Sequence, residues 1–570
     1  MRETRPRTGI RRARRGLAAL AAIAALALTA CASIPTDGPV NQGETETTED
    51  GFDVDVLVRG PQAGATQQQI LDGFIDAAAS PRGNYEVARK FLTPAFEDEW
   101  QADEGVTVDV LADRSPTQLG DDLIRYRIVP EARLEPNGQY LETGSSEPVQ
   151  LEYRFERVDE EWRISEAPPG VLIDETNFGL VYRAYTLAFF DPQFRFVVPD
   201  IRWFAGRESA QTSIVRALLD GPAEWLAPGV ASAFPDDLQL DQATVPVTGG
   251  IADVSLEGAA FDNLQTIQLM QYQLAQSLDG VRNVDGVDLS LNGVPVSAPE
   301  LTDPPERTLR IDPRPVVSVG ESFGYLSASG DTFTPLEGVS DQVVALAPSA
   351  AAVGPGATSA AVLAADGVLL VAQGEETVLL DPRGGLITPA LDVDGIVWSV
   401  PRDSPDQLAW FGADGDGAQI AVPWNADAIV SLQLSRDGTR MLALLADGAR
   451  TRTVVASVQR DEQGRPLELG PVALELSGSV GTPLDAAWLD STTVGTLTAP
   501  ATGETRLSVQ RLGAPAESRD GPVEGIQLDG ANSLRDLRVL AANGDLVTGA
   551  GVAWQVQARD VRFIATQQTG

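Results

Sequence analysis

The hydrophobic pattern of the first folded segment reads as a strand followed by helices. Residues 52–58 alternate between apolar and polar side chains, as in a half-buried β-strand. Thr66 and Gln69 form a capping-box sequence ahead of apolar residues at helical spacing, and a second helical stripe starts near Asn84. Strand-like runs follow at residues 106–111, 123–129, 149–158 and 162–164. We predict a small α+β domain over residues 51–170, and an NTF2-like cone is one form that this order of elements allows.

Residues 180–300 alternate again between strand and helix patterns, with clear stop signals. An apolar helical stripe that includes Leu218 ends at Gly221-Pro222, and we expect Leu218 to be buried. A second stripe over residues 264–278 ends at Asp279-Gly280. Strands are predicted at residues 194–198, 201–203, 252–256 and 287–291, the last before an Asn292-Gly293 hairpin turn. This pattern predicts a second α+β domain.

Helical periodicity disappears after a proline-rich stretch. Residues 301–315 contain four prolines and are predicted to form a stiff linker. From residue 316 onward, short strand-like runs alternate with Asp-Gly and Asn-Gly turns, most clearly over residues 429–445. Less clear copies of this strand-turn-strand unit recur at intervals of roughly 40–50 residues. This spacing predicts a β-propeller of five or six blades over residues 316–570. A pair of β-sandwiches is the alternative.

A propeller must also close the seam between its first and last blades, because an open seam exposes strand edges. The first strand-like runs lie within residues 316–326 and the last within residues 552–564. We therefore expect residues 552–566 to lie in the same blade as residues 316–335, or directly against it.

The N-terminal residues have the pattern of an export signal. Residues 1–15 carry seven arginines and one glutamate, and residues 16–30 carry no charge. The uncharged stretch is shorter than the roughly 20 residues that span a bilayer. It ends at Leu28-Thr-Ala-Cys31, which resembles a bacterial lipobox. We predict a signal peptide over residues 1–30, an N-palmitoyl and S-diacylglycerol modification on Cys31, and a flexible lipidated tether over residues 31–50.

This interpretation places the protein on the extracytoplasmic face of the cell membrane, held there by lipid. Two alternatives are a membrane-spanning anchor with an incidental cysteine, and export through the twin-arginine route. Cys31 is the only cysteine in the sequence, so a thioether to lipid also explains why an exported chain keeps one unpaired thiol.

Composition narrows the function further. The formal charge is −39, and cleavage before Cys31 would leave it near −45, which argues against binding nucleic acid. The sequence contains no histidine, which excludes Ser-His-Asp triads, Cys-His dyads and histidine-rich zinc sites. Carboxylate chemistry, as in glycoside hydrolysis, is the enzymatic route that remains. No catalytic, cofactor-binding or metal-binding residue is predicted.

Several residues that could form sites have simpler interpretations. Asp414-Gly-Asp416 resembles the start of a calcium loop, but Gln419 and Asn425 stand where such a loop needs glycine and glutamate. We predict a hairpin turn there, and another turn at Asp392 and Asp394. The tryptophans of the C-terminal segment are expected to pack between blades rather than to line a recognition face: Trp398, Trp410, Trp424, Trp488 and Trp554.

Taken in order, these segments resemble the LpqB lipoproteins of Gram-positive actinobacteria. The resemblance rests on residues 28–40 around the lipobox, on residues 69–75 and 88–93, and on a middle segment that resembles the GerMN domain through residues 217–222, 234–235, 252–256, 273–275 and 292–293. The C-terminal segment resembles the propeller of the family mainly in its turns. The family offers no catalytic residues to carry over.

The resemblance implies a multidomain protein: an α+β domain, a GerMN-like α+β domain over residues 180–300 and a propeller. It also implies an accessory lipoprotein of a two-component system that contacts the extracellular domain of an MtrB-like sensor kinase. Signalling through MtrA would then affect cell-wall homeostasis and division. The alternative function is a carboxylate-based wall-polymer hydrolase or a sugar-binding lipoprotein.

Overall fold

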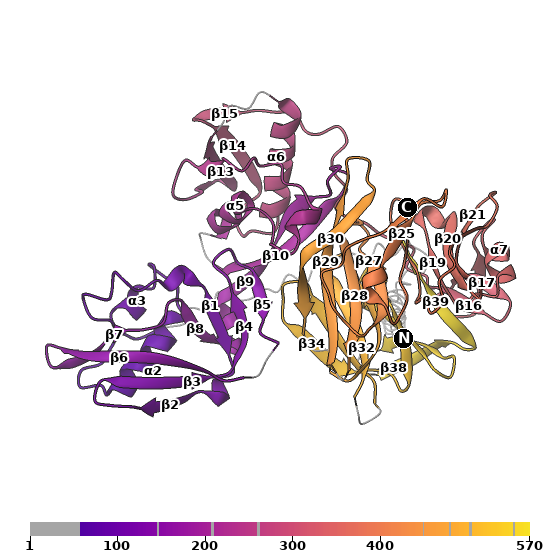
Figure 1. The fold of residues 1–570 in the computed structure, drawn as a ribbon. Helices are drawn as coiled ribbons and strands as arrows, with labels where there is room; N and C mark the ends of the chain where they lie inside the picture. The colour runs from indigo at the N-terminus through magenta and orange to yellow at the C-terminus, as the bar shows by residue number, and fades with distance from the viewer. Residues whose placement is uncertain are drawn as a thin grey trace, which may run out of the picture. The chain divides into compact units, whose positions relative to one another are not determined.

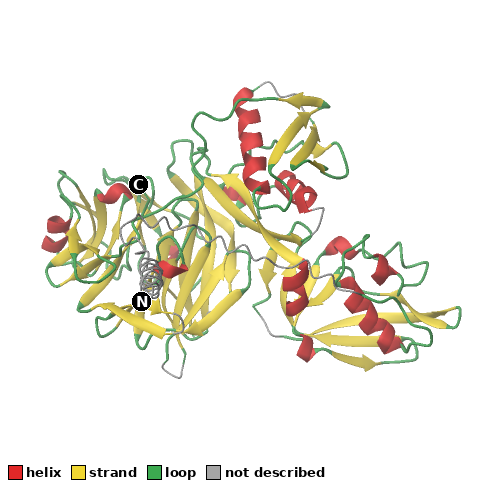
Figure 2. Ribbon diagram, turned by 180° about the vertical axis from the view of Figure 1, so that it is seen from behind, coloured by secondary structure: helices red, strands yellow, loops and turns green. Residues whose placement is uncertain are grey.

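The computed structural model describes residues 58–144, 147–206, 210–258, 263–448, 450–477, 480–500, 504–550 and 553–569. Figures 1 and 2 show the domains that these residues form. Residues 52–57 of the strand predicted at 52–58 lie outside the described residues, as do the signal peptide, Cys31 and the tether.

The N-terminal domain combines two helices with two four-stranded sheets. Helix α2 (Gln67–Ala78) begins at the predicted capping box: the Gln69 amide donates to Thr66 Oγ1 at 3.3 Å, and the Thr66 amide donates to Gln69 Oε1 at 2.9 Å. The sheet orders are β5-β4-β1-β8 and β2-β3-β6-β7. Their strands are β1 (Val106–Asp109), β2 (Ser115–Gln118), β3 (Leu123–Ile128), β4 (Pro130–Leu134), β5 (Tyr140–Glu142), β6 (Val149–Val158), β7 (Glu161–Glu166) and β8 (Val171–Asp174). The NTF2-like form stays a prediction.

The second helix predicted for this domain is much shorter than its apolar stripe suggested. Helix α3 covers only Glu86–Arg89, because Asn84 and Tyr85 before it adopt positive φ and Pro94 follows shortly after it. Phe91 lies in a turn and Leu92 forms an isolated β-bridge with Ile164, and both are nevertheless buried. The apolar stripe therefore predicted the burial of Phe91 and Leu92 correctly, although it did not predict their secondary structure.

A long antiparallel ribbon follows helix α4 (Glu175–Val181). It consists of β9 (Tyr182–Phe190) and β10 (Val197–Ala205), paired along their full lengths. The two short strands predicted at 194–198 and 201–203 are therefore one strand, and residues 194–196 belong to the turn. Asp191 Oδ1 holds that turn by accepting the amides of Arg195 and Phe196 at 2.6 and 2.7 Å.

The middle domain contains helices α5 (Ala210–Asp220) and α6 (Leu264–Leu278). Its sheet joins β13 (Ile251–Glu257) in parallel to β14 (Gly286–Leu291), with β11 (Gln239–Leu240), β12 (Val247–Thr248) and β15 (Val294–Val296) as neighbours. Leu218 is 1% exposed, as predicted, and Gly221 stops α5 at φ +91°. Asn292 and Gly293, at φ +51° and +74°, form the predicted hairpin turn.

The C-terminal strands form one eight-stranded sheet, in the order β18-β17-β16-β39-β19-β20-β21-β22, and four four-stranded sheets. We number the two halves of the eight-stranded sheet as blades 1 and 2, and the other sheets as blades 3 to 6. Blade 1 contains β16 (Val316–Val319), β17 (Ser322–Leu326), β18 (Phe333–Pro335) and β39 (Val561–Gln567). Blade 2 contains β19 (Ala350–Val353), β20 (Ser359–Ala364), β21 (Gly367–Ala372) and β22 (Val378–Asp381), and blade 3 contains β23 (Ala390–Leu391), β24 (Val397–Ser399), β25 (Ala409–Phe411) and β26 (Gly417–Gln419). Blade 4 contains β27 (Ala428–Leu434), β28 (Arg440–Asp447), β29 (Arg450–Arg460) and β30 (Pro466–Leu476), and blade 5 contains β31 (Thr482–Trp488), β32 (Thr493–Ala499), β33 (Arg506–Arg511) and β34 (Ala516–Asp520). Blade 6 contains β35 (Gly525–Asp529), β36 (Arg538–Ala541), β37 (Leu546–Ala550) and β38 (Ala553–Ala558).

Blade 1 is closed by strands from both ends of this region, as predicted. Strand β39 pairs antiparallel with β16, and its last residues also pair in parallel with β19 of blade 2. Strand β38 belongs to the neighbouring blade 6, and Gln557 on it donates a 3.1 Å hydrogen bond to the carbonyl of Ser327. Residues 553–566 therefore lie within or directly against the blade that contains residues 316–335.

Candidate functional site at the domain junction

The β9–β10 ribbon contributes side chains to the cores of two domains. At one end, Tyr182 and Trp203 lie in the N-terminal core, where the ring of Phe178 is 5.1 Å from both of theirs. At the other end, Phe189 and Phe190 are fully buried in the middle-domain core. The sequence pattern did not predict β9 as a strand.

A buried ion pair fixes the centre of the ribbon. Asp200 and Arg202 are 4% and 0% exposed, and Arg202 Nη2 lies 2.7 Å from Asp200 Oδ2. Arg202 Nη1 also donates to the carbonyl of Asn137 in the N-terminal domain, and Asp200 Oδ2 accepts the amide of Ala223 in the middle domain. A buried pair is tolerated when further hydrogen bonds satisfy both groups, as they do here. The pair therefore joins two domains.

The same ribbon contacts the propeller. Trp203 Nε1 donates a 2.7 Å hydrogen bond to the carbonyl of Gly513, and Arg511 Nη2 donates a 3.0 Å hydrogen bond to Thr186 Oγ1. Val198, which is fully buried, packs in one hydrophobic cluster with residues of blades 4 and 5.

A middle-domain loop over residues 223–230 completes this junction. Trp225 and Leu226, 8% and 0% exposed, share a hydrophobic cluster with propeller residues Leu442, Leu444, Val455, Ala486, Trp488, Val494 and Leu512. A Cβ at Gly229 would lie 2.9 Å from Ser457 Cβ, so only glycine allows this close approach without displacement. Residues of the middle domain and of the propeller thus form one hydrophobic cluster.

A chain of ion pairs runs alongside the apolar contact. Arg195 Nη1 lies 2.6 Å from Asp394 Oδ1 in the propeller, and its Nε lies 3.2 Å from Asp191 Oδ2 in its own turn. The hydrogen bonds that Arg195 donates to Asp394, together with both nearby carboxylates, raise the pKa of Arg195 above its ordinary value. Asp394 also lies 3.8 Å from Arg460 Nη1. The chain therefore continues into the interior of the propeller.

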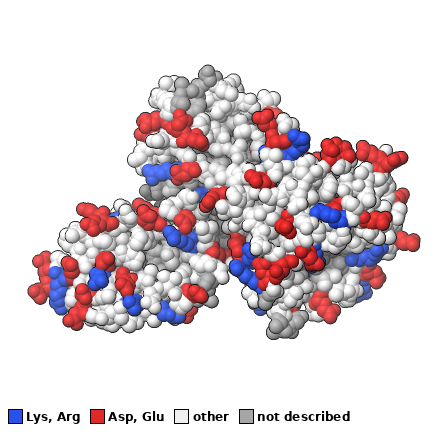
Figure 3. All heavy atoms as spheres, viewed as in Figure 1, with Lys and Arg blue, Asp and Glu red and all other residues white. Residues whose placement is uncertain are grey.

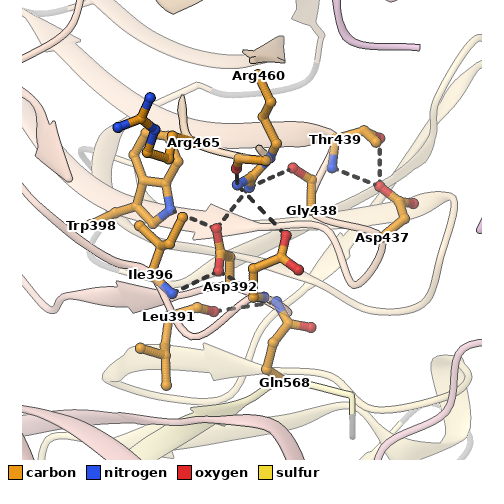
Figure 4. A network of polar contacts seen from close by, with 12 residues as sticks. Leu391, Asp392, Ile396, Trp398, Asp437, Gly438, Thr439, Arg460, Arg465 and Gln568 are labelled. Carbon is orange, nitrogen blue, oxygen red and sulfur yellow. Dashed lines mark hydrogen bonds and ion pairs between the residues drawn. The ribbon is translucent and has the colours of Figure 1, made fainter. Parts of the chain in front are cut away.

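Asp392 is the centre of this interior network (Figure 4). It is fully buried, and its carboxylate accepts the amides of Asp394 and Ile396, Trp398 Nε1 and Arg460 Nη2. Arg460, which ends β29, also donates through Nη2 to the carbonyl of Gly438 at 3.1 Å, so Arg460 connects Asp392 of blade 3 with blade 4. The predicted turn at Asp392 and Asp394 is confirmed, but its structural role extends well beyond the turn.

The chain segments that enter and leave the propeller meet near its axis. Asn532 exchanges two hydrogen bonds with the backbone of Ile311, and Arg436 donates to the carbonyls of Leu309 and Ala531. Gln568 Nε2 donates to the carbonyls of Leu391 and Ser435. Residues 301–315, predicted as a stiff linker, contain no helix or strand, but they are bound to the propeller rather than free of it.

A small cavity remains between these segments. It has space for about 30 Å³ of solvent, and its lining includes Ile311, Gln433, Arg436, Trp488, Asp529 and Gln568. Burial raises the pKa of Asp529 to about 7, although Arg538 and Arg436 nearby oppose this shift. Burial also lowers the pKa of Arg436. Nothing in the sequence pattern singled out Arg436 or Asp529, since each is an isolated charged position next to a turn.

The remaining sequence-predicted positions are structural. Asp414 and Asp416 occupy an exposed turn before β26, as predicted. Trp398, Trp424 and Trp488 are buried, whereas Trp410 and Trp554 are half-buried. Among the described residues, no group of three or more histidine, cysteine, aspartate or glutamate side chains is placed to hold a metal ion. Cys31 lies outside the described residues.

Three family models match the chain in consecutive segments. Residues 60–179 match "Lipoprotein LpqB, N-terminal domain", residues 185–297 match "Sporulation and spore germination", and residues 324–562 match "Lipoprotein LpqB beta-propeller domain". The tandem GerMN domains of GerM from Bacillus subtilis are 17% identical, with a TM-score of 0.17, 21% of this chain covered and 45% of that one. So low a TM-score carries no argument.

Curated relatives carry the same family name. The "Lipoprotein LpqB" of Thermobifida fusca is 29% identical over 48% of this chain, a match that spans only 46% of the relative's own length. That of Cutibacterium acnes is 24% identical over 82% of this chain and 83% of its own. The two LpqB models together cover more than half of the chain, and the three models occur in the order of the observed domains. The chain therefore belongs to the family of LpqB lipoproteins.

Proposed function

We propose that this protein is a non-enzymatic, membrane-anchored lipoprotein that acts outside the cytoplasm as an accessory regulator of an MtrB-like sensor kinase. Its regulation through an MtrA-type response regulator would affect cell-wall homeostasis and division. The observation that carries the proposal is the junction described above, in which the ribbon and the 223–230 loop join all three domains through buried contacts. Such a junction holds the three domains together, so one partner can contact more than one of them.

The proposed anchor is lipid on Cys31. Its support is the lipobox at residues 28–31 and the lipoprotein name shared by the relatives. In the part of the chain that the structure describes, no helix has the length and apolar character needed to cross a bilayer.

We propose that the acidic surface of this protein attracts the partner through opposite charge. The sequence contains 81 acidic and 42 basic residues, and Figure 3 shows aspartate and glutamate spread over the displayed face without a continuous basic area. A surface of this sign favours a partner that presents basic residues, and such attraction mainly speeds association. The interaction should therefore weaken as ionic strength rises.

Crosslinking in whole cells tests the proposal. A photoreactive amino acid would replace one exposed apolar residue in each domain: Leu111 (60% exposed), Val294 (64%) and Val523 (84%). We expect kinase peptides to be captured at one or more of these positions. Buried Leu218 would serve as the matched control that captures none. Absence of kinase peptides at all three exposed positions, in cells that contain both proteins, would contradict the proposed partner.

One pair of acids that the fold places together, Asp109 and Asp174, does not favour the alternative of a carboxylate-based hydrolase. Asp109 and Asp174 are register partners on the parallel strands β1 and β8. However, Arg114 binds Asp109 through Nε at 2.9 Å and Nη2 at 2.7 Å, and Asp174 caps helix α4 by accepting the amide of Asn177. Both carboxylates therefore have structural partners. Release of soluble sugar from purified cell wall, in proportion to the added protein, would support the alternative.

A further inference from the structure

The sheet of the middle domain has one open face. The side chains on its other face are buried in the domain core: Ala252, Val254 and Leu256 on β13, and Leu289 and Leu291 on β14. Helix α6 packs on that buried side, and Figures 1 and 2 show no described helix over the opposite side. Asp253 on β13 and Asp288 on β14 alternate with the buried residues and are exposed. This open face is therefore available to a partner.

Two acidic residues lie side by side on this open face. Asp253 and Asp288 are register partners on the parallel strands β13 and β14, and neighbouring strands are about 4.8 Å apart. Neither carboxylate has an ion-pair partner in the described part of the chain. Like charges next to each other on a sheet are destabilising, so cationic groups from a partner would relieve this repulsion.

The middle domain itself supplies few cations. Arg216 and Arg282 are the only basic residues within residues 210–258 and 263–300. Arg216 lies on α5, where it donates to the carbonyl of Ala243, and Arg282 lies in the turn that follows α6. Figure 3 shows a group of acidic side chains on the strand side of this domain. The charge of the open face is therefore left for another molecule to balance.

The exposed sheet of the N-terminal domain differs in this respect. There, Arg125 on β3 lies 2.8 Å from Glu152 on β6, and Arg154 on β6 lies 2.9 Å from Glu166 on β7. Arginines of the same sheet thus balance acids on neighbouring strands. Unpaired acids on adjacent strands are therefore a particular feature of the middle-domain sheet in this comparison.

We propose that the open face of the middle-domain sheet, centred on Asp253 and Asp288, binds an arginine- or lysine-bearing segment of a protein partner. Guanidinium and ammonium groups donate charge-assisted hydrogen bonds to carboxylates. Ile251, 37% exposed on the same face of β13, adds an apolar contact beside Asp253. A metal ion is not favoured, because among the described residues no group of three or more acidic side chains is placed to hold one. This surface rests on the accessory function proposed above and specifies where its partner binds.

A photoreactive amino acid in place of Ser290 tests this surface in whole cells that make the full chain. Ser290 lies on β14 two residues after Asp288, on the same face. We expect capture of a peptide that contains arginine or lysine, and about tenfold less of it when Asp253→Asn and Asp288→Asn are combined, as expected for lost hydrogen bonds between charged groups. Glu152→Gln combined with Glu166→Gln is the matched control, because it neutralises two exposed acids of the N-terminal sheet, and it should leave the yield unchanged.

Thermal unfolding checks that the variants fold, and removing the repulsion between Asp253 and Asp288 should not lower the unfolding temperature. If it does, Asp253→Asn alone replaces the pair. Capture of no basic peptide at Ser290, or an equal yield after both aspartates are neutralised, would overturn the proposal. A basic peptide from a protein other than the kinase would support this surface and contradict the partner proposed above. Capture of the kinase at Leu111 or Val523 but not at Ser290 would support that partner and contradict this surface.

Discussion

The contact between the middle domain and the propeller can be tested by removing the side chain of Leu226. This side chain is fully buried, and it packs against propeller residues rather than against the core of its own domain. Leu226→Ala should cost about 2–5 kcal/mol of the free energy of unfolding, the usual range for a buried leucine. The upper half of this range is expected, because the surrounding strands of blade 4 are held in their sheet and cannot collapse into the space.

Leu218→Ala provides the matched comparison. Leu218 is 1% exposed, but it packs within the middle-domain core. Hydrogen exchange of backbone amides distinguishes the two variants, because it reports local opening free energies along the chain. Leu226→Ala should accelerate exchange in β28 and β29 of blade 4, and Leu218→Ala should accelerate it in α5 and α6 and leave blade 4 protected. Unchanged protection of β28 and β29 in Leu226→Ala would refute the shared core.

Three further predictions concern other parts of the chain. The raised pKa of Asp529, about 7 when folded against about 3.9 when unfolded, means that the folded protein holds a proton that the unfolded chain releases. This contribution to stability is complete below about pH 4 and is lost as the pH rises through 7. Asp529→Asn should therefore reduce the fall in unfolding free energy that is measured between pH 5 and pH 8. An equally steep fall in the variant would show that Asp529 is not the cause. Deleting residues 561–569 removes β39 from between β16 and β19, so calorimetry should show loss of cooperative unfolding of the whole propeller, whereas a parent-like melting curve would contradict the closure. Cys31→Ala should block lipidation and cleavage before residue 31, and mass spectrometry of the membrane-extracted protein would disprove the anchor if the N-terminus began elsewhere without a lipid mass.

Local signals predicted much of the secondary structure. The capping box at Thr66, the glycine stop at Gly221 and the Asn292-Gly293 turn all depend on residues within a few positions of one another. A single sequence displays such relations directly, because backbone sterics and short-range hydrogen bonds decide them. The recurring Asp-Gly turns likewise indicated the propeller, since each blade repeats the same strand-and-turn unit.

Local pattern was misleading where neighbouring residues changed the backbone path. The stripe near Asn84 predicted a full helix, but positive φ at Asn84 and Tyr85 and the proline at position 94 restrict it to four residues. The separate strands predicted at 194–198 and 201–203 became the turn and body of one strand, because Asp191 binds the turn amides and β9 supplies a partner along the full length of β10.

The junction and the axial cavity were decided only by tertiary structure. The hydrogen bond between Trp203 and Gly513 joins residues 310 positions apart, and the one between Arg436 and Leu309 joins residues 127 positions apart. Leu226 and Arg436 look like an ordinary apolar residue and an ordinary charged turn residue in the sequence, and their burial depends on which blade folds against them. Sequence by itself determined the order and kind of the elements, because these follow from neighbouring residues. Which polar groups lose water, and which domains share a core, depends on distant segments meeting in space.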